Sequence, residues 1–250
     1  MKPILLFDLG DTLVGYYQRE EFPPILHEAL QGAKQAIQEV GLPTPADREI
    51  ARRAALENHE ARNYRVRPLE QRLLRIFGLG TSETDGVLLL AMCRAFLKPI
   101  FAVATVYPDT LPALSTYRKQ GYSVGILSNS PWGAPAALWQ EELTRHGLSK
   151  LCDRAIFCTQ VGWRKPAQPM FRLALRRFAC RPQDCLFVGD QPKWDILGAR
   201  RAGMFPVLID RRGRANESFD PCIRSLPELG EILKRWPTAH FAPTHQGADS

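Results

Sequence analysis

Residues 3–13 read PILLFDLGDTL: a short apolar run ends at Asp8, and the turn-forming pair Gly10-Asp11 follows almost at once. The run Pro3–Asp8 predicts a β-strand, because it is short, continuous and bounded by a turn signal. A strand that is apolar on both faces is typical of the middle of a parallel sheet covered by helices on each side. We therefore expect a central strand with a carboxylate at its carboxyl end.

A long segment with helical periodicity follows this strand. From about Glu21 to Val103 apolar residues recur at helical spacing, and Gly/Pro-rich breaks separate successive helices. Four helices are expected, over Pro23–Val40, Ala46–Asn58, Leu69–Phe77 and Thr84–Phe101. Because the segment separates the first strand from all the others, it predicts an inserted helical cap.

Beyond Tyr107 strands and helices alternate. Strands are expected over Ser123–Leu127, Ala155–Cys158, Cys185–Val188 and Pro206–Ile209. Helices are expected over Thr110–Gln120, Ala134–His146, Pro169–Phe178, Ile196–Ala202 and Leu226–Trp236. Strands joined through helices form right-handed crossovers in a parallel sheet. The chain is therefore predicted to be an α/β protein, a Rossmann-like doubly wound parallel sheet with an inserted α-helical cap.

The same patterns predict the domain limits. Residues 1–16 and 105–237 are assigned to the Rossmann-like core and residues 17–104 to the helical cap. The polar residues 238–250, which show no periodicity, are predicted to be a flexible tail.

The composition is that of an ordinary globular protein. Hydrophobic residues make up 45% and charged residues 24% of the chain, values that exclude collagen-like, disordered and coiled-coil proteins. The net charge of +7 favours anionic partners, but nucleic acid is not expected, since only Tyr64 supplies an aromatic ring among the basic residues of the cap. No apolar run approaches the roughly 18 residues of a membrane span. The six cysteines form no CxxC pair, so a reduced, cytoplasmic location is expected.

Chemically active side chains follow the predicted strands. Ligands of a doubly wound sheet bind beyond the carboxyl ends of its strands, and here those positions, with one loop before a helix, combine carboxylates, a hydroxyl and a lysine. These residues are Asp8, Ser128, Asn129, Lys165, Asp190 and Asp195. The combination suits a metal ion and a phosphate.

Four motifs stand in a fixed order along the chain. They are FDLGDTL at 7–13, LSNS at 127–130, Lys165-Pro166, and VGDQPKWDILGARRAG at 188–203. Each is weak alone, but the ordered set resembles the haloacid dehalogenase-like hydrolase superfamily over all of the chain except the cap and the tail. The resemblance implies a Mg²⁺-dependent hydrolase, most simply a phosphatase that cleaves a small phosphomonoester, with an anionic, phosphorylated small molecule as its partner.

The resemblance also implies a role for each carboxylate. Asp8 would be the nucleophile and would form an aspartyl-phosphate. Asp8, the backbone carbonyl of Gly10 and Asp190 would bind Mg²⁺, which offsets the repulsion between the nucleophile and an anionic substrate. Asp195 would complete or support the metal site, although capping of the helix at Ile196 is an alternative for this residue.

Four further residues are implied to bind the substrate or its phosphate. Ser128 would donate a hydrogen bond to a phosphoryl oxygen, and Lys165 would stabilise the charge around the nucleophile. Asn129 would accompany Ser128, and Thr12 would orient the loop beside Asp8. The alternatives are a solvated lysine at position 165 and ordinary turn hydroxyls at Thr12 and Ser128.

One position departs from the pattern of the superfamily's phosphatases. They usually carry a second aspartate two residues after the nucleophile, which acts as general acid and then as general base, whereas this chain has Gly10 there. Loss of that proton transfer typically costs about 10²–10⁴-fold in rate. Asp11 could take over the role or could be a turn residue. A slow or specialised phosphatase is the expectation.

The same departure keeps two other functions open. The superfamily's 2-haloacid dehalogenases also lack this aspartate and carry a serine-asparagine pair that resembles Ser128-Asn129. Their reaction displaces halide from carbon and needs no metal, so the pair Asp190 and Asp195 favours phosphoryl transfer. A catalytically degenerate binding protein, with Gly10 as the lesion, is the third possibility.

Aromatic residues flank the motifs. Trp132, Trp163 and Trp194 could form a rim around a substrate, as could Tyr16 and Tyr17, or all of them could pack around loops.

The cap is rich in arginine. Its arginines could attract an anionic substrate, or they could form a solvated surface balanced by Asp47, Glu49, Glu57, Glu60 and Glu70. The arginines in question are Arg48, Arg52, Arg53, Arg62, Arg65, Arg67, Arg72 and Arg75.

Overall fold

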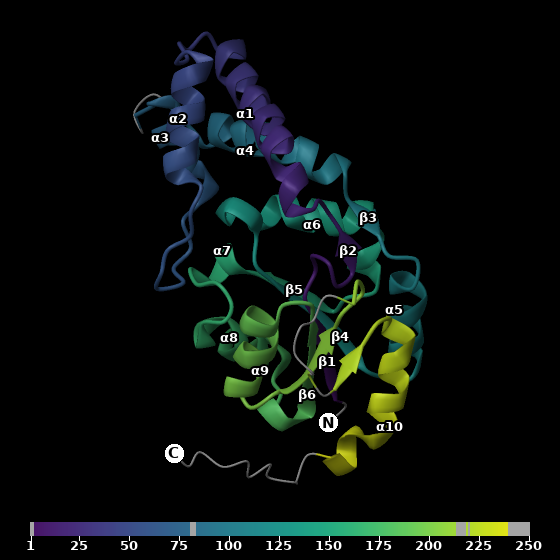
Figure 1. Ribbon diagram of the computed structural model, residues 1–250. Coiled ribbons are helices and arrows are strands. Elements are labelled where there is room, and N and C mark those ends of the chain that lie inside the picture. Colours follow the sequence, from purple (N-terminus) through teal and green to yellow (C-terminus); the bar gives the residue numbers. More distant parts are fainter. Residues whose placement is uncertain (1–2, 81–83, 214–218, 220, 240–250) are drawn as a thin grey trace.

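Figure 1 shows the computed structural model of the chain, in which a helical region stands above a core built around a parallel sheet. The structure describes residues 3–80, 84–213, 219 and 221–239. In this part of the chain, none of the helices combines the length and the hydropathy needed to cross a lipid bilayer. All six cysteines are free thiols.

The core contains a six-stranded parallel sheet with the strand order β5-β4-β1-β6-β7-β8. The strands are β1 (Ile4–Phe7), β4 (Ser123–Ser128), β5 (Arg154–Phe157), β6 (Cys185–Gly189), β7 (Phe205–Ile209) and β8 (Cys222–Ile223). The last residue of β1, Phe7, pairs with Ile126 of β4 on one side and with Val188 of β6 on the other. The first strand is therefore central, as the apolar run predicts.

Helices cover both faces of this sheet. They are α5 (Thr110–Lys119), α6 (Ala136–Arg145), α7 (Cys158–Val161), α8 (Gln168–Phe178), α9 (Leu197–Arg201) and α10 (Leu229–Ala239). Alternate residues of β1 point to opposite faces: Leu5 and Phe7 belong to the larger apolar cluster, whereas Ile4 and Leu6 belong to a second one that includes Phe171 of α8. The prediction of a doubly wound α/β fold is confirmed.

The inserted region is helical, as predicted. Its helices are α1 (Phe22–Glu39), α2 (Asp47–Glu57), α3 (Leu69–Phe77) and α4 (Gly86–Ala102). An antiparallel pair of two-residue strands, β2 (Val14–Gly15) and β3 (Thr105–Val106), joins its two ends to the core. Strands this short carry no periodicity, so the sequence pattern does not predict them. The limits 17–104 for the cap and 1–16 with 105–237 for the core stay predictions.

The predicted tail at 238–250 overlaps the last helix and otherwise stays a prediction. The last helix, α10, continues to Ala239, two residues into that segment. Buried Leu233 and Trp236 anchor this helix in the core, and its final turn extends from them. Residues 240–250 lie outside the described part of the chain.

Candidate active site

Three of the sequence motifs meet at the carboxyl edge of the sheet. Asp8 follows β1, Ser128 ends β4 and Asp190 follows β6, and β1 lies between the other two strands. The backbone N–H of Asp8 donates to the carbonyl of Val188 at 2.9 Å, which extends the pairing of β1 with β6 by one residue. Lys165 reaches the same place from the loop between α7 and α8.

Lys165 forms a buried ion-pair network with two aspartates. Its Nζ lies 2.8 Å from Oδ1 of Asp8 and 2.6 Å from Oδ1 of Asp195. The Lys165 side chain is only 2% exposed. Burial alone would lower the pKa of Lys165, but the charges of Asp195 and Asp8 raise it above its ordinary value. Lys165 is therefore a charged residue within the site and not a solvated surface lysine.

Three carboxylates form a compact cluster. Asp8, Asp190 and Asp195 each contribute one oxygen, and these oxygens all lie within 4.8 Å of one another. Burial, followed by the charges of Asp195 and Asp8, raises the pKa of Asp190 to about 8. A divalent cation would relieve this repulsion, and a set of oxygen donors suits a hard cation. The residues present therefore fit a metal ion.

Asp195 is tied to the turn that follows β6. Its Oδ2 accepts a hydrogen bond from the backbone N–H of Gln191 at 3.0 Å, within a π-type turn over Pro192–Ile196. The residue lies inside this turn and does not cap a helix that begins at Ile196. Gly189 contributes to the site in a way that the sequence pattern does not reveal. A Cβ there would lie 2.4 Å from Oδ2 of Asp195, so only glycine allows this approach.

Asn129 holds the backbone of Lys165. Its Oδ1 accepts the N–H of Lys165 at 2.8 Å, and its Nδ2 donates to the Lys165 carbonyl at 3.3 Å. Both polar atoms of the amide thus face the main chain of the lysine. The neighbouring Ser128 is buried, and its Oγ donates to the carbonyl of Asn129 at 3.3 Å. The sequence predicts a polar residue after β4, but it does not predict that the Asn129 amide binds the backbone of Lys165 through two hydrogen bonds.

Thr12 is fully buried beneath the loop that follows Asp8. Its Oγ1 has no hydrogen-bond partner within the described part of the chain. Its carbonyl accepts two hydrogen bonds, from Nε and Nη2 of Arg211 at 2.9 and 2.8 Å. The loop of the first motif is therefore fixed from the side of β7.

The order of the motifs, the buried lysine and the carboxylate cluster agree with a family comparison. Residues 3–203 match the haloacid dehalogenase-like hydrolase family. The chain belongs to that family.

Relatives of this haloacid dehalogenase-like hydrolase include phosphatases and dehalogenases. The glyceraldehyde 3-phosphate phosphatase of Methanopyrus kandleri is 31% identical over 216 residues, which cover 84% of each chain. A HAD phosphatase from Thermococcus onnurineus has a TM-score of 0.65 at 26% identity, over 93% of this chain and 98% of that one. A 2-haloacid dehalogenase from Pseudomonas syringae shares the fold, with a TM-score of 0.65 at 24% identity, over 94% and 100% of the two chains.

Asp11 of this haloacid dehalogenase-like hydrolase adopts a left-handed turn conformation with φ 53°. Its Oδ1 lies 3.1 Å from Nη2 of Arg212 and accepts a hydrogen bond from the hydroxyl of Tyr107 at 3.3 Å. Gly10 lies outside the left-handed region. The backbone conformation at position 10 therefore does not require glycine, whereas Asp11 is a turn residue with a partnered carboxylate.

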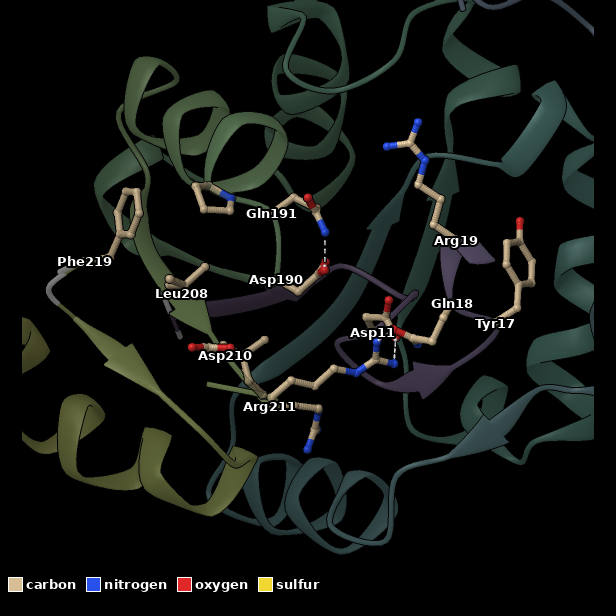
Figure 2. A pocket seen from close by; sticks show the side chains of 13 residues that line it. Asp11, Tyr17, Gln18, Arg19, Asp190, Gln191, Leu208, Asp210, Arg211 and Phe219 are labelled. Carbon is tan, nitrogen blue, oxygen red and sulfur yellow. Dashed lines mark hydrogen bonds and ion pairs between the residues drawn. The ribbon is translucent and has the colours of Figure 1, made fainter. Parts of the chain in front are cut away.

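A cavity of about 480 Å³ borders the cluster on the side of β7. Figure 2 shows Asp11 and Asp190 near the middle of the view, with Arg19 and Tyr17 to one side and Leu208 and Phe219 to the other. The dashed lines in the figure mark the contact of Asp11 with an arginine and the hydrogen bond of Asp190 with Gln191. The cavity gives this haloacid dehalogenase-like hydrolase open space next to one carboxylate of the cluster.

A cap segment reaches down to the loop that carries Lys165. Residues 58–68, between α2 and α3, form this segment, here called the cap strap; in Figure 1 it is the blue loop that descends beside α7. The N–H of Val66 donates to the carbonyl of Gly162 at 3.1 Å, and the N–H of Arg164 donates to the carbonyl of Tyr64 at 2.8 Å. The cap strap thus pairs with the residues just before Lys165.

Side chains reinforce this pairing. Oε2 of Glu60 lies 3.1 Å from Nη1 of Arg164, and the guanidinium of Arg65 lies 3.9 Å from the ring centre of Trp163. Tyr64 meets Trp194 edge to face, with 5.9 Å between ring centres. Trp163 and Trp194, two of the three tryptophans that flank the motifs, thus lie at the junction of cap and core.

The third tryptophan, Trp132, is buried. Its ring packs against Phe96 of α4 with 5.2 Å between centres, and the guanidinium of Arg72 lies 5.2 Å from it. Trp132 therefore packs in the interior and does not form part of a rim around a substrate.

Most of the cap arginines are paired within the cap. Glu49 binds Arg52 and Arg53, Glu57 binds Arg67 and Arg75, and Glu60 binds Arg72. These five arginines bind glutamates of the cap and are not directed at an anionic substrate. Arg72 is buried, so it does not belong to a solvated surface.

Proposed function

We propose that this haloacid dehalogenase-like hydrolase is a Mg²⁺-dependent phosphatase that cleaves small phosphomonoesters through an aspartyl-phosphate on Asp8. The observation that carries the proposal is the buried ammonium of Lys165 between Asp8 and Asp195, next to the carboxylate of Asp190. A positive charge beside a carboxylate nucleophile suits an anionic substrate. The relatives named as phosphatases support the same reaction.

In the first step, a carboxylate oxygen of Asp8 attacks phosphorus, and the ester P–O bond breaks. Its electron pair leaves with the leaving-group oxygen as an alkoxide or phenolate, which solvent protonates. Lys165 and the hydroxyl of Ser128 hold the phosphoryl oxygens as charge develops on them. Asn129 acts indirectly, since its amide fixes the backbone of Lys165. In the second step, water attacks the aspartyl-phosphate, which releases phosphate and restores Asp8.

Asp8, Asp190 and the carbonyl of Gly10 would hold Mg²⁺. No hydrogen bond in the described part of the chain occupies that carbonyl. Asp195 supports the site by fixing Lys165 and the turn at Gln191. The metal ion, when bound, neutralises charge shared by the nucleophile and the phosphoryl group.

Glyceraldehyde 3-phosphate is the first substrate to test, because the Methanopyrus kandleri relative carries that name. The partner is thus a small phosphorylated molecule. The six free cysteines fit a reducing compartment, and a cytoplasmic location belongs to the proposal.

Metal dependence separates this proposal from halide displacement. EDTA should reduce phosphate release to background, and added Mg²⁺ should restore it, because without the cation three clustered carboxylates repel an anionic substrate. The measurement is phosphate release from a panel of phosphorylated metabolites, with chloride release from 2-chloropropionate followed in parallel. Chloride release that continues unchanged in EDTA, without phosphate release, would instead establish a dehalogenase.

The glycine at position 10 should make turnover depend on the leaving group. Phenyl phosphate departs as a weakly basic phenolate and needs little protonation, so it should be cleaved faster than cyclohexyl phosphate. A Cβ at Gly10 would have its nearest neighbour, Cδ2 of Tyr16, at 3.9 Å, so a side chain can begin at this position without a clash. Gly10→Asp should narrow the ratio of kcat/KM values between the two esters, by up to about 10²–10⁴-fold.

Asp11→Asn is the matched control for Gly10→Asp. Because Arg212 and Tyr107 already bind the Asp11 carboxylate, this variant should leave the ratio of the two esters unchanged. A selective loss of cyclohexyl phosphate hydrolysis in Asp11→Asn would assign the proton transfer to Asp11. Equal wild-type rates on both esters would show that Gly10 has no such effect.

A further inference from the structure

Glu60 of the cap strap joins the cap to the residue just before Lys165. Its Oε2 lies 3.0 Å from Nη2 of Arg72 and 3.1 Å from Nη1 of Arg164. Arg72 belongs to α3 of the cap, whereas Arg164 belongs to the loop between α7 and α8 that carries Lys165. One carboxylate oxygen therefore bridges an arginine of the cap and an arginine of the Lys165 loop.

Arg72 fixes the cap end of this bridge. Its side chain is buried, at 1% exposure. Nε donates to the carbonyl of Arg67 at 3.1 Å, and Nη1 donates to the carbonyl of Glu57 at 2.9 Å. Because these carbonyls lie within the strap and directly before it, the guanidinium holds the strap in one shape and presents Nη2 to Glu60. The Glu60 carboxylate is thus held in place from the cap.

The other end of the bridge lies next to the catalytic lysine. Arg164 and Lys165 are neighbours in the chain, but their side chains meet different partners: Arg164 meets Glu60, and Lys165 meets Asp8 at 2.8 Å. Asn129 binds the backbone of Lys165 from the end of β4. The lysine is therefore held between the core and the cap, and a shift of Arg164 would move the ammonium next to it.

We propose that Glu60 is a positioning residue that holds Arg164 and thereby fixes the place of the Lys165 ammonium beside the nucleophile. The inference rests on the proposed phosphatase function, in which Lys165 stabilises the charge that develops on the phosphoryl oxygens. Misplacement of a reacting group by about 1 Å can cost about 10²-fold in rate. The strap then makes the cap part of the machinery of the chemical step.

Glu60→Gln tests this role, because it keeps the size of the side chain and removes its charge. The kcat for phenyl phosphate should fall about 10-fold while KM stays close to the wild-type value, since the ammonium acts mainly on the transition state. The measurement is the initial rate of phosphate release over a range of ester concentrations. A rise in KM at unchanged kcat would assign the strap to substrate binding and overturn the proposal.

Glu49→Gln is the matched control. Glu49 lies in α2 of the same cap, its side chain is 33% exposed against 32% for Glu60, and it also binds two arginines. Both of them, Arg52 and Arg53, belong to α2 itself. The same substitution at Glu49 should therefore leave kcat and KM unchanged.

Arg164→Met shows whether the effect passes through Arg164. In this background Glu60→Gln should cause no further fall in kcat, because the bridge to the Lys165 loop is already broken. Losses that multiply in the double variant would show that Glu60 acts by another route and would overturn its role in positioning Lys165.

Trypsin tests the bridge without any measurement of activity. The strap contains Arg62 and Arg65, and cleavage after them, followed by mass spectrometry, should be faster in Glu60→Gln than in the wild type or in Glu49→Gln. Equal cleavage rates would show that Glu60 does not hold the strap on the Lys165 loop.

The outcomes separate the role of Glu60 from the proposed function. Unchanged kcat in Glu60→Gln, beside an active wild type, would overturn the role of Glu60 and leave the phosphatase intact. If the wild-type protein releases phosphate from no ester and from no phosphorylated metabolite, the proposed function fails and the role of Glu60 fails with it.

Discussion

Replacement of Asp8 by asparagine should abolish phosphate release, with a fall in kcat of about 10³-fold or more. An amide oxygen is a far poorer nucleophile than a carboxylate, and no other described carboxylate lies in the same relation to Lys165 and Ser128 at the end of β1. The fold should survive, because asparagine keeps the size of the side chain and Lys165 retains its ion pair with Asp195. The measurement is kcat together with the thermal unfolding midpoint.

Asp184→Asn is the matched control for this change. Asp184 lies just before β6, at the amino edge of the sheet, where it pairs with Arg181 on the surface. The same substitution there should leave kcat unchanged. Activity of Asp8→Asn above a few per cent of wild type, in a preparation free of contaminating phosphatase, would remove Asp8 from the role of nucleophile.

Lys165→Met should lower both stability and activity. Methionine fills a similar volume, but Asp8 and Asp195 then lose the cation that lies 2.8 and 2.6 Å from them. Removal of one partner from a buried ion pair typically costs about 3–5 kcal/mol, because a buried charge stays uncompensated. We expect a loss of that size in the free energy of urea unfolding, with kcat reduced by about 10²-fold or more.

A double variant separates the two losses. Asp195→Asn in the Lys165→Met background removes the fully buried negative charge, so part of the unfolding free energy should return while kcat stays low. A Lys165→Met protein as stable as wild type would show that the network contributes nothing to folding. Unchanged kcat in that protein would show that Lys165 does not act on the phosphoryl group.

The positions of the main site residues could be predicted because they depend on local patterns. A continuous apolar run predicts a central strand, and the carboxyl ends of neighbouring parallel strands meet at one edge. Those two rules predict that Asp8, Ser128 and Asp190 lie together at one edge of the sheet. The four helices of the cap could also be predicted, because each carries an apolar stripe at helical spacing.

Features that depend on contacts between distant segments could not be predicted. The clamp of Asn129 on Lys165 joins residues 36 positions apart. The close approach of Asp195 to Gly189 depends on how the chain turns after β6. The ion-pair partners of the cap arginines could not be predicted for the same reason. Helical spacing predicts which residues share one face of a helix, whereas Glu57 of α2 binds Arg75 of the next helix, α3.

The cap strap limits how the cap can move relative to the core. The cap is joined to the core by the β2–β3 pair and again by the strap, so it cannot lift from the Lys165 loop on one hinge alone. Lifting must break the hydrogen bonds donated by the N–H groups of Val66 and Arg164. These two amide protons then become accessible to solvent, and the rate at which they exchange for deuterium reports how often the strap side of the molecule opens. Deuterium exchange at the amides of Val66 and Arg164 therefore measures how often the strap separates from the Lys165 loop, a motion that steady-state rates do not report.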